Sequence, residues 1–261
     1  MKKLFTLAIG SFAVHGTASL KTFTHTLGEH ILPVPSVLLN GLTNMQLVKR
    51  FDTPFQALLE GSFELAVHRD VDLILYIGYL GNAQQAVIIK EAIQKYKPII
   101  KTIITDPVCG DHGRAYVSKE VIEQWPSLIE QSDFTFPNLT ELKILTNQLP
   151  EKVGEADVFI QDFITRFPQT NLIATSIPFE NDGLGIKVFG KEVFTYSQKQ
   201  QPNHFGGSGD ALVAHFILYH YYKHLSFEEA LRKAVDRVAF LMQHSIAVGT
   251  TDLLLNFPQE F

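Results

Sequence analysis

The glycine-rich turn at residues 205–210, which reads Phe-Gly-Gly-Ser-Gly-Asp, is the segment best suited to chemistry. Glycines let successive backbone N–H groups converge on one point, and the apolar helix that follows adds partial positive charge, so the turn can hold an anion. Beside it, Asp210 can accept the proton of an attacking hydroxyl while Gly207, Ser208 and Gly209 stabilise a transferring phosphoryl group. The segment alone also fits an ordinary loop in which Asp210 caps a helix.

Carboxylates also follow two short apolar runs. Residues 106–111, Asp-Pro-Val-Cys-Gly-Asp, come directly after one run, and Asn138 and Glu141 stand one helical turn apart after the other. In an open parallel sheet, ligands gather at the carboxyl ends of the strands. Magnesium bound to a nucleotide keeps several waters and takes one or two protein carboxylates, which Asp106 and Glu141 could supply. Each segment also has a structural interpretation, a turn in the first case and a helix capping box in the second.

Two common nucleotide-binding signatures are missing from the sequence. It contains neither the pattern G-x-x-x-x-G-K-[ST] nor a strand-linked G-x-G-x-x-G. The P-loop and dinucleotide-binding interpretations therefore lose their main support, and a nucleotide would have to bind in another way.

The elements that must position these residues follow from hydrophobic periodicity. Short apolar runs alternate with longer segments of helical period, a pattern typical of βαβ units and a largely parallel sheet. Buried strands are predicted at residues 4–9, 34–39, 73–77, 102–105, 134–136 and 172–174. Helices are predicted at about residues 17–27, 54–68, 82–96, 119–131, 138–146 and 155–167.

The last third of the chain has a different pattern. Residues 184–189 and 192–196 flank a Gly-Lys turn and predict an antiparallel hairpin. Two long helices then follow, one from Gly209 to about residue 219 and one from about 230 to 247 with Ser226 as its N-cap. We assign many apolar positions of the second helix to core packing. We expect a single α/β domain over residues 1–261, with one doubly wound, mostly parallel sheet flanked by helices.

Composition narrows the possible partners and compartments. The formal net charge is −5 and no run of Lys or Arg stands out, so nucleic acid is not expected as a partner. The single cysteine, Cys109, excludes an intramolecular disulfide and a cysteine-based zinc site, and we interpret it as a small buried hydrophobe. Two lysines before an apolar stretch resemble a signal peptide, but the stretch fits a buried first strand equally well. We therefore predict a cytoplasmic protein with no membrane partner.

Three segments, in this order and at these distances, resemble motifs of the ribokinase-like superfamily, and within it the pyridoxal kinase branch. Residues 106–111 resemble its D-P-V-M-G-D with Cys109 in place of methionine, residues 136–141 its T-P-N-x-x-E, and residues 207–210 its G-T-G-D with Ser208 in place of threonine. Residues 79–81 resemble its G-Y-L-G segment, and residues 173–176 a strand that ends in Thr-Ser beside the nucleotide. The resemblance covers nearly the whole chain.

This resemblance implies an ATP-dependent, magnesium-requiring transferase of vitamin B6 metabolism. It implies that Asp210 is the catalytic base and that the glycine turn forms the anion hole. Such kinases commonly use a monovalent cation such as K⁺ and are often homodimers. The remaining positions that it assigns are Asp106 and Glu141 near Mg²⁺ and the ATP phosphates, Asn138 as their support, Thr175 and Ser176 beside the nucleotide, and Ser11, Thr43 and Tyr79 at the substrate.

The acceptor end departs from the pyridoxal kinase pattern. Leu42 stands where a histidine would stack on the substrate ring, and Ala13 and Val14 replace the usual glycines after the first strand. Residues 16–23 also resemble the A-D-L-K-T-F stretch of hydroxymethylpyrimidine kinases. Phosphorylation of pyridoxal, pyridoxine or pyridoxamine and phosphorylation of a hydroxymethylpyrimidine therefore both remain open, since both acceptors are flat heteroaromatic rings with a hydroxymethyl group.

A rival from another class is a relative that binds a vitamin or nucleotide without catalysis. The retained Asp210 and the complete glycine turn argue against it.

Overall fold

The computed structural model describes residues 2–42, 45–146 and 156–256. Its main feature is a nine-stranded sheet with the strand order β11-β10-β9-β8-β5-β4-β1-β2-β3. Neighbouring strands from β9 across to β2 are parallel, and antiparallel pairs occur only at the edges, between β2 and β3, β9 and β10, and β10 and β11. The strands are β1 Leu4–Ala13, β2 Ile31–Leu39, β3 Arg50–Asp52, β4 Asp72–Ile77, β5 Ile100–Thr105, β8 Phe134–Thr135, β9 Asn171–Phe179, β10 Gly183–Phe189 and β11 Phe194–Lys199.

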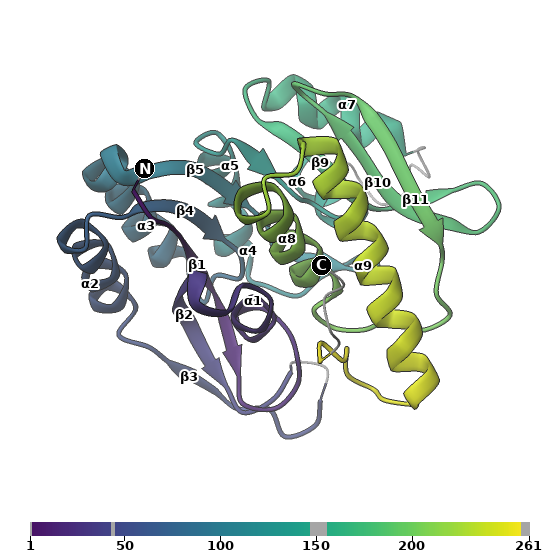
Figure 1. Cartoon of the computed structure of the whole chain (residues 1–261), viewed down its shortest axis with the longest axis horizontal. Coiled ribbons are helices and arrows are strands. Elements are labelled where there is room, and N and C mark those ends of the chain that lie inside the picture. The colour runs from purple at the N-terminus through teal and green to yellow at the C-terminus, as the bar shows by residue number, and fades with distance from the viewer. Residues whose placement is uncertain (1, 43–44, 147–155, 257–261) are drawn as a thin grey trace.

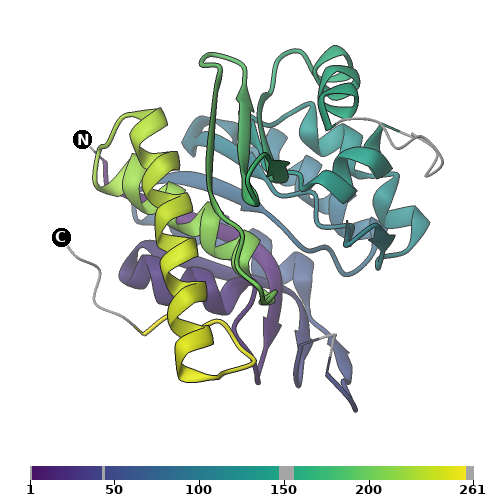
Figure 2. The same cartoon turned by 90° about the vertical axis from the view of Figure 1, so that its right-hand side faces the viewer.

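Helices cover both faces of this sheet (Figures 1 and 2). On one face, α1, α8 and α9 pack on an apolar cluster that includes Phe23, Phe216 and Leu231. The opposite face has its own cluster, which includes Phe63, Trp125 and Phe163 from the helices between β3 and β9. The helices are α1 Leu20–Leu27, α2 Phe55–His68, α3 Ala83–Tyr96, α4 Lys119–Ile122, α5 Trp125–Ile129, α6 Leu139–Leu145, α7 Ala156–Arg166, α8 Ser208–Ile217 and α9 Phe227–Val248.

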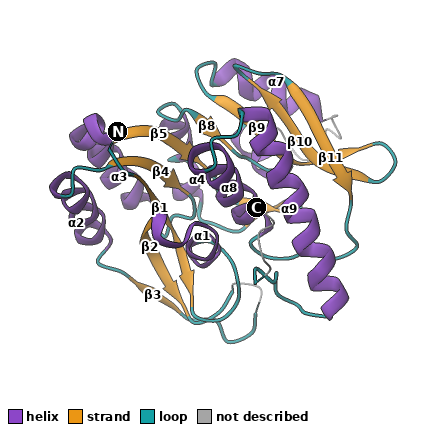
Figure 3. Ribbon diagram, in the orientation of Figure 1, coloured by secondary structure: helices purple, strands orange, loops and turns teal. Residues whose placement is uncertain are grey.

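The predicted doubly wound α/β class is confirmed. Each of the six predicted buried strands lies within or overlaps an observed strand, and the predicted hairpin is β10 and β11 (Figure 3). None of the helices in the described ranges combines enough length and hydrophobicity to span a lipid bilayer.

Several boundaries differ from the predictions. The single helix expected at residues 119–131 is two short helices, α4 and α5, because Pro126 lacks an N–H group and cannot sit in a helix interior. Helix α1 begins at Leu20 rather than residue 17, since Ser19 has a positive φ of 50°. Helix α8 ends at Ile217 and continues as a π-helical turn, Leu218–Tyr222.

Three short strands have no counterpart in the sequence predictions. The edge strand β3 consists of three exposed residues, too few to show periodicity. The hairpin of β6 Gly110–Asp111 and β7 Arg114–Ala115 is shorter still, and it arises within the loop that follows β5.

Candidate active site

A cleft of about 780 Å³ opens at the carboxyl ends of the parallel strands. The segments that border it follow or end β1, β4, β5, β8 and β9, which is where ligands bind in open α/β sheets. Of the predicted site residues, Thr43 lies outside the described residues. All the others line this one cleft: Ser11, Tyr79, Asp106, Asn138, Glu141, Thr175, Ser176, Gly207, Ser208, Gly209 and Asp210.

The glycine turn is held by close contact with the loop before α1. Gly207 is the N-cap of α8 with φ 84°, a left-handed conformation that favours glycine. A Cβ atom at Gly207 would also collide with the carbonyl oxygen of Thr17. Gly209, in contrast, has no atom within 4 Å of its Cβ position. The first N–H groups of α8 have no partners within the helix, and its dipole favours an anion there.

Asp210 lies in the first turn of α8 and is tied to α1. One of its carboxylate oxygens, Oδ2, accepts a hydrogen bond of 2.8 Å from the backbone N–H of Ser19. Burial raises the pKa of Asp210 to about 6, and the Ser19 N–H opposes that rise. At neutral pH the carboxyl group is therefore mostly ionised, with a basicity close to that of the solution, which suits a proton acceptor.

Asp106 follows β5 and is only 8% exposed. Tyr76 donates a hydrogen bond from its hydroxyl group to Oδ2 of Asp106 over 3.4 Å. Burial and then the charge of Asp210 hold the pKa of Asp106 well above its ordinary value, while the Tyr76 hydroxyl lowers it. Asp106 and Asp210 therefore interact electrostatically across the cleft.

Glu141, at 2% exposure, forms the capping box expected from the structural interpretation. Its Oε2 accepts a bond of 2.8 Å from the backbone N–H of Asn138, and its own N–H donates to Asn138 Oδ1 over 3.0 Å. Its Oε1 also accepts from the backbone N–H of Cys109 over 3.1 Å, and Asn138 Nδ2 donates to the Gly110 carbonyl. Glu141 and Asn138 thus join the start of α6 to the loop after β5.

The buried carboxylates destabilise one another as anions. Burial and the charge of Asp106 hold the pKa of Glu141 above its ordinary range, against the N–H groups of Asn138 and Cys109. A bound cation would relieve this repulsion. Among the described residues no three His, Cys, Asp or Glu side chains are grouped so as to hold a metal ion. The two buried carboxylates of Asp106 and Glu141 fit Mg²⁺, which needs one or two carboxylates besides waters and nucleotide phosphates.

On the other side of the cleft, β9 carries Thr175 and Ser176. The backbone N–H of Thr175 donates to the Pro137 carbonyl over 2.9 Å, which keeps β9 beside the start of α6. Ser176 has φ 55°, a strained conformation for a residue with a side chain and one that is common at functional sites.

The structure adds lining residues that sequence reasoning left open or missed. The rings of His112 and His204 approach edge to face with centroids 4.5 Å apart and line the cleft, a placement that the sequence could not distinguish from incidental surface histidines. Val238 and Met242 of α9 line the cleft as well, while many other apolar positions of this helix pack in the core, as predicted. The sequence could not reveal the role of Ser19, because this residue binds Asp210 through its backbone N–H and not through its side chain.

Cys109 is fully buried, as expected. Burial and the nearby charges of Glu141 and Asp106 raise the pKa of its thiol, so it is not a reactive nucleophile.

A mostly parallel sheet with a glycine turn and a carboxylate at the start of a helix fits the ribokinase-like class of small-molecule kinases. The sequence profile of the phosphomethylpyrimidine kinase family matches residues 17–256, and the chain belongs to that family. The protein is thus an ATP-dependent kinase.

Individual relatives agree with this assignment. A Schizosaccharomyces pombe protein provisionally named pyridoxal kinase is 24% identical over 221 residues, which span 80% of this chain and 71% of that protein. The crystal structure of pyridoxal kinase from Entamoeba histolytica superposes with a TM-score of 0.84 at 23% identity, over 97% of this chain and 92% of the other. Pyridoxal kinase from Leishmania donovani in complex with ADP and pyridoxamine gives a TM-score of 0.79 at 23% identity, over 97% and 90%.

Proposed function

We propose that this kinase transfers the γ-phosphoryl group of ATP to the hydroxymethyl group of pyridoxal, pyridoxine or pyridoxamine, which yields the 5′-phosphate. The observation that carries the proposal is that Asp210, at the end of the glycine turn, shares one cleft with Asp106 and Glu141. Relatives named as pyridoxal kinases, one of them in complex with ADP and pyridoxamine, support the choice of acceptor.

In this mechanism Asp210 accepts the proton of the acceptor hydroxyl as the oxygen attacks the γ-phosphorus. The raised pKa of Asp210 increases its affinity for that proton, and the Ser19 N–H holds one carboxylate oxygen so that the other faces the substrate. The N–H groups of the turn formed by Gly207, Ser208 and Gly209 stabilise the charge on the transferring group. Thr175 and Ser176 contact the nucleotide.

Magnesium, when bound, would neutralise the phosphate oxygens, with Asp106 and Glu141 as the carboxylates that hold it, in part through water. Asn138 keeps Glu141 in place through the capping box. Tyr79, Ser11 and Leu42, which line the same cleft, would contact the acceptor.

A hydroxymethylpyrimidine or its phosphate is the second candidate acceptor. Two observations favour it: the match to the phosphomethylpyrimidine kinase profile, and the likeness of residues 16–23 to hydroxymethylpyrimidine kinases. Both acceptors present a flat ring and a primary hydroxyl group, so Asp210 would accept a hydroxyl proton in either reaction.

ATP consumption by the wild-type protein tests the proposal. Pyridoxal, pyridoxine, pyridoxamine and hydroxymethylpyrimidine are each supplied with MgATP, and the phosphorylated product is identified by mass. We expect the largest kcat/KM with one of the three vitamin B6 compounds. A larger value with hydroxymethylpyrimidine would select the second candidate, and no turnover with any of the four would reject the kinase mechanism in favour of a binding protein.

A further inference from the structure

The loop after β4, residues 78–81, forms one wall of the acceptor end of the cleft and is bonded on three sides. Tyr79 lines the cleft, and its carbonyl oxygen accepts a bond of 2.7 Å from the Ser36 hydroxyl on β2. The N–H of Gly78 donates to the carbonyl of Ile9 on β1. A Cβ atom at Gly81 would lie 2.5 Å from Val37, so the loop also packs tightly on β2. The position of the Tyr79 ring therefore depends on contacts made behind the loop.

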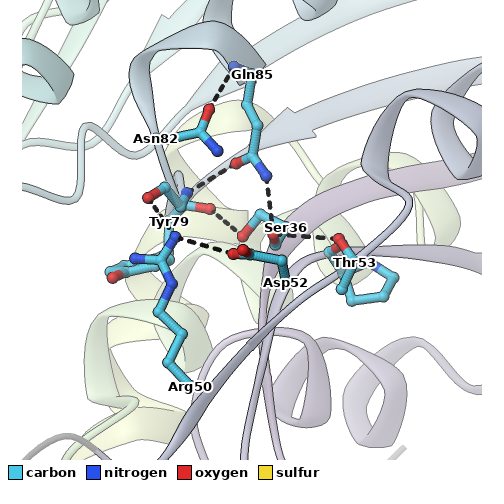
Figure 4. A network of polar contacts seen from close by, with 9 residues as sticks. Ser36, Arg50, Asp52, Thr53, Tyr79, Asn82 and Gln85 are labelled. Atoms are coloured by element: carbon cyan, nitrogen blue, oxygen red, sulfur yellow. Dashed lines mark hydrogen bonds and ion pairs between the residues drawn. The ribbon is translucent and has the colours of Figure 1, made fainter.

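Gln85 is the central residue of those contacts (Figure 4). It lies in the first turn of α3, is 5% exposed and uses both ends of its side-chain amide. Its Oε1 accepts from the backbone N–H of Gly81 over 2.7 Å, and its Nε2 donates to the carbonyl of Ser36 over 2.8 Å. The amide thus bridges the backbone of the Tyr79 loop and the backbone of β2. A glutamine side chain meets both needs of this position, because its amide oxygen accepts from Gly81 and its amide nitrogen donates to Ser36.

The same network reaches the second acceptor-facing segment. Arg50 on β3 donates to the carbonyl of Gly81 over 2.6 Å, and Thr53 donates to the Ser36 carbonyl over 3.2 Å. Strand β3 ends the loop that begins after β2 and carries Leu42, which lines the cleft. The Tyr79 loop and the base of the Leu42 loop are therefore both joined to β2 through hydrogen bonds of Gln85, Ser36 and Arg50. None of these three residues lines the cleft.

We infer that Gln85 is a positioning residue for the acceptor: its amide sets the distance between the Tyr79 wall and the rest of the cleft and thereby the fit of the acceptor ring. This inference rests on the proposed phosphorylation of a hydroxymethyl heteroaromatic. The ATP site is bordered by other segments, which include α6, β9 and the glycine turn. A substitution of Gln85 should therefore weaken acceptor binding and leave nucleotide binding unchanged.

Steady-state kinetics of Gln85→Met test the inference, with Gln84→Met as the matched control. Methionine has a similar length but cannot bond to Gly81 or Ser36, while Gln84 is the exposed neighbour on the same helix. We expect Gln85→Met to raise the KM for the acceptor that the wild-type protein uses best by about tenfold, with the KM for ATP within about twofold. Gln84→Met should match the wild-type values. A purely structural role would instead lower kcat with both KM values unchanged.

A second variant keeps the test decisive if Gln85→Met does not fold. Ser36→Ala removes the hydrogen bond from the Ser36 hydroxyl to the Tyr79 carbonyl. Calorimetry should then show weaker binding of the same acceptor and unchanged binding of MgATP. An unchanged acceptor affinity in Ser36→Ala, or in a folded Gln85→Met, would overturn the inference and leave the proposed function standing. Absence of wild-type turnover with all four acceptors would reject both.

Discussion

The two ends of the cleft are built in different ways. The proposed phosphate end consists of short continuous segments, residues 106–111, 136–141 and 207–210, and in the proposed mechanism much of its chemistry comes from backbone N–H groups. The proposed acceptor end consists of single cleft-lining side chains such as Tyr79 and Leu42, each held by a different part of the chain. Transfer chemistry is therefore encoded locally, whereas the choice of acceptor depends on how distant segments pack.

The two ends of the cleft also differ in their electrostatics. Asp106, Glu141 and Asp210 crowd the phosphate end, where burial raises the pKa of all three. Apolar Leu39 and Leu42 line the acceptor end. The phosphate end is thus preorganised for a cation and a proton, and the acceptor end for an uncharged ring face. Changes at the first end should alter kcat and metal dependence, and changes at the second should alter acceptor KM.

The largest effect on activity is expected for Asp210→Asn, which removes the proton acceptor and keeps the shape of the side chain. The value of kcat should fall by about 10²- to 10⁴-fold with little change in acceptor KM. Because burial disfavours the Asp210 anion in the folded protein, the melting temperature should not fall. The exposed Asp157→Asn is the control. A kcat within about tenfold of wild type would show that Asp210 is not the base.

A pair of glycine variants separates backbone strain from the loss of charge stabilisation. Gly207→Ala should lower the free energy of unfolding by about 1–3 kcal/mol and reduce kcat strongly, because the residue has a positive φ and a methyl group would collide with Thr17. Gly209→Ala has open space and should leave stability unchanged. Denaturant unfolding of both proteins checks this difference. Equal stability of the two would mean that the turn is not held against the α1 loop.

Acid should inactivate the enzyme at a higher pH than an ordinary aspartate allows. Since burial raises the pKa of Asp210 to about 6, this carboxyl group is protonated below that pH and can no longer accept a proton. The value of kcat/KM should therefore decline as pH falls through about 6, by roughly tenfold for each further unit. A pH profile measured with saturating magnesium checks this expectation, and a decline centred near pH 4 would contradict it.

Glu141→Gln should alter the response to magnesium more than the binding of the ring. Loss of this carboxylate should raise the magnesium concentration for half-maximal activity by about tenfold, while the acceptor KM stays unchanged. Glutamine also cannot accept both backbone N–H groups that bond to Glu141, so stability should decrease by about 1 kcal/mol. A magnesium titration beside the exposed control Glu130→Gln measures the effect. An unchanged midpoint would remove Glu141 from the metal site.

By itself the sequence determined the fold class and the phosphate end of the cleft. Buried parallel strands are continuous apolar runs, and each motif there is a contiguous segment whose role follows from glycine conformations and carboxylate spacing. Hence residue types and spacing, together with the resemblance to a kinase family, were sufficient to name positions such as Asp106, Glu141 and Asp210, and these residues line one cleft.

Only the tertiary structure decided which groups support that cleft. Ser19 acts through a backbone N–H 191 residues away from Asp210, and Gln85 through bonds to the backbone of two other segments, neither of which leaves a pattern in side-chain types. The raised pKa values likewise depend on burial and, for Asp106 after β5, on its proximity to Asp210 of α8. Burial and proximity arise when the sheet forms, because its twist and strand order bring together residues that are far apart in the chain.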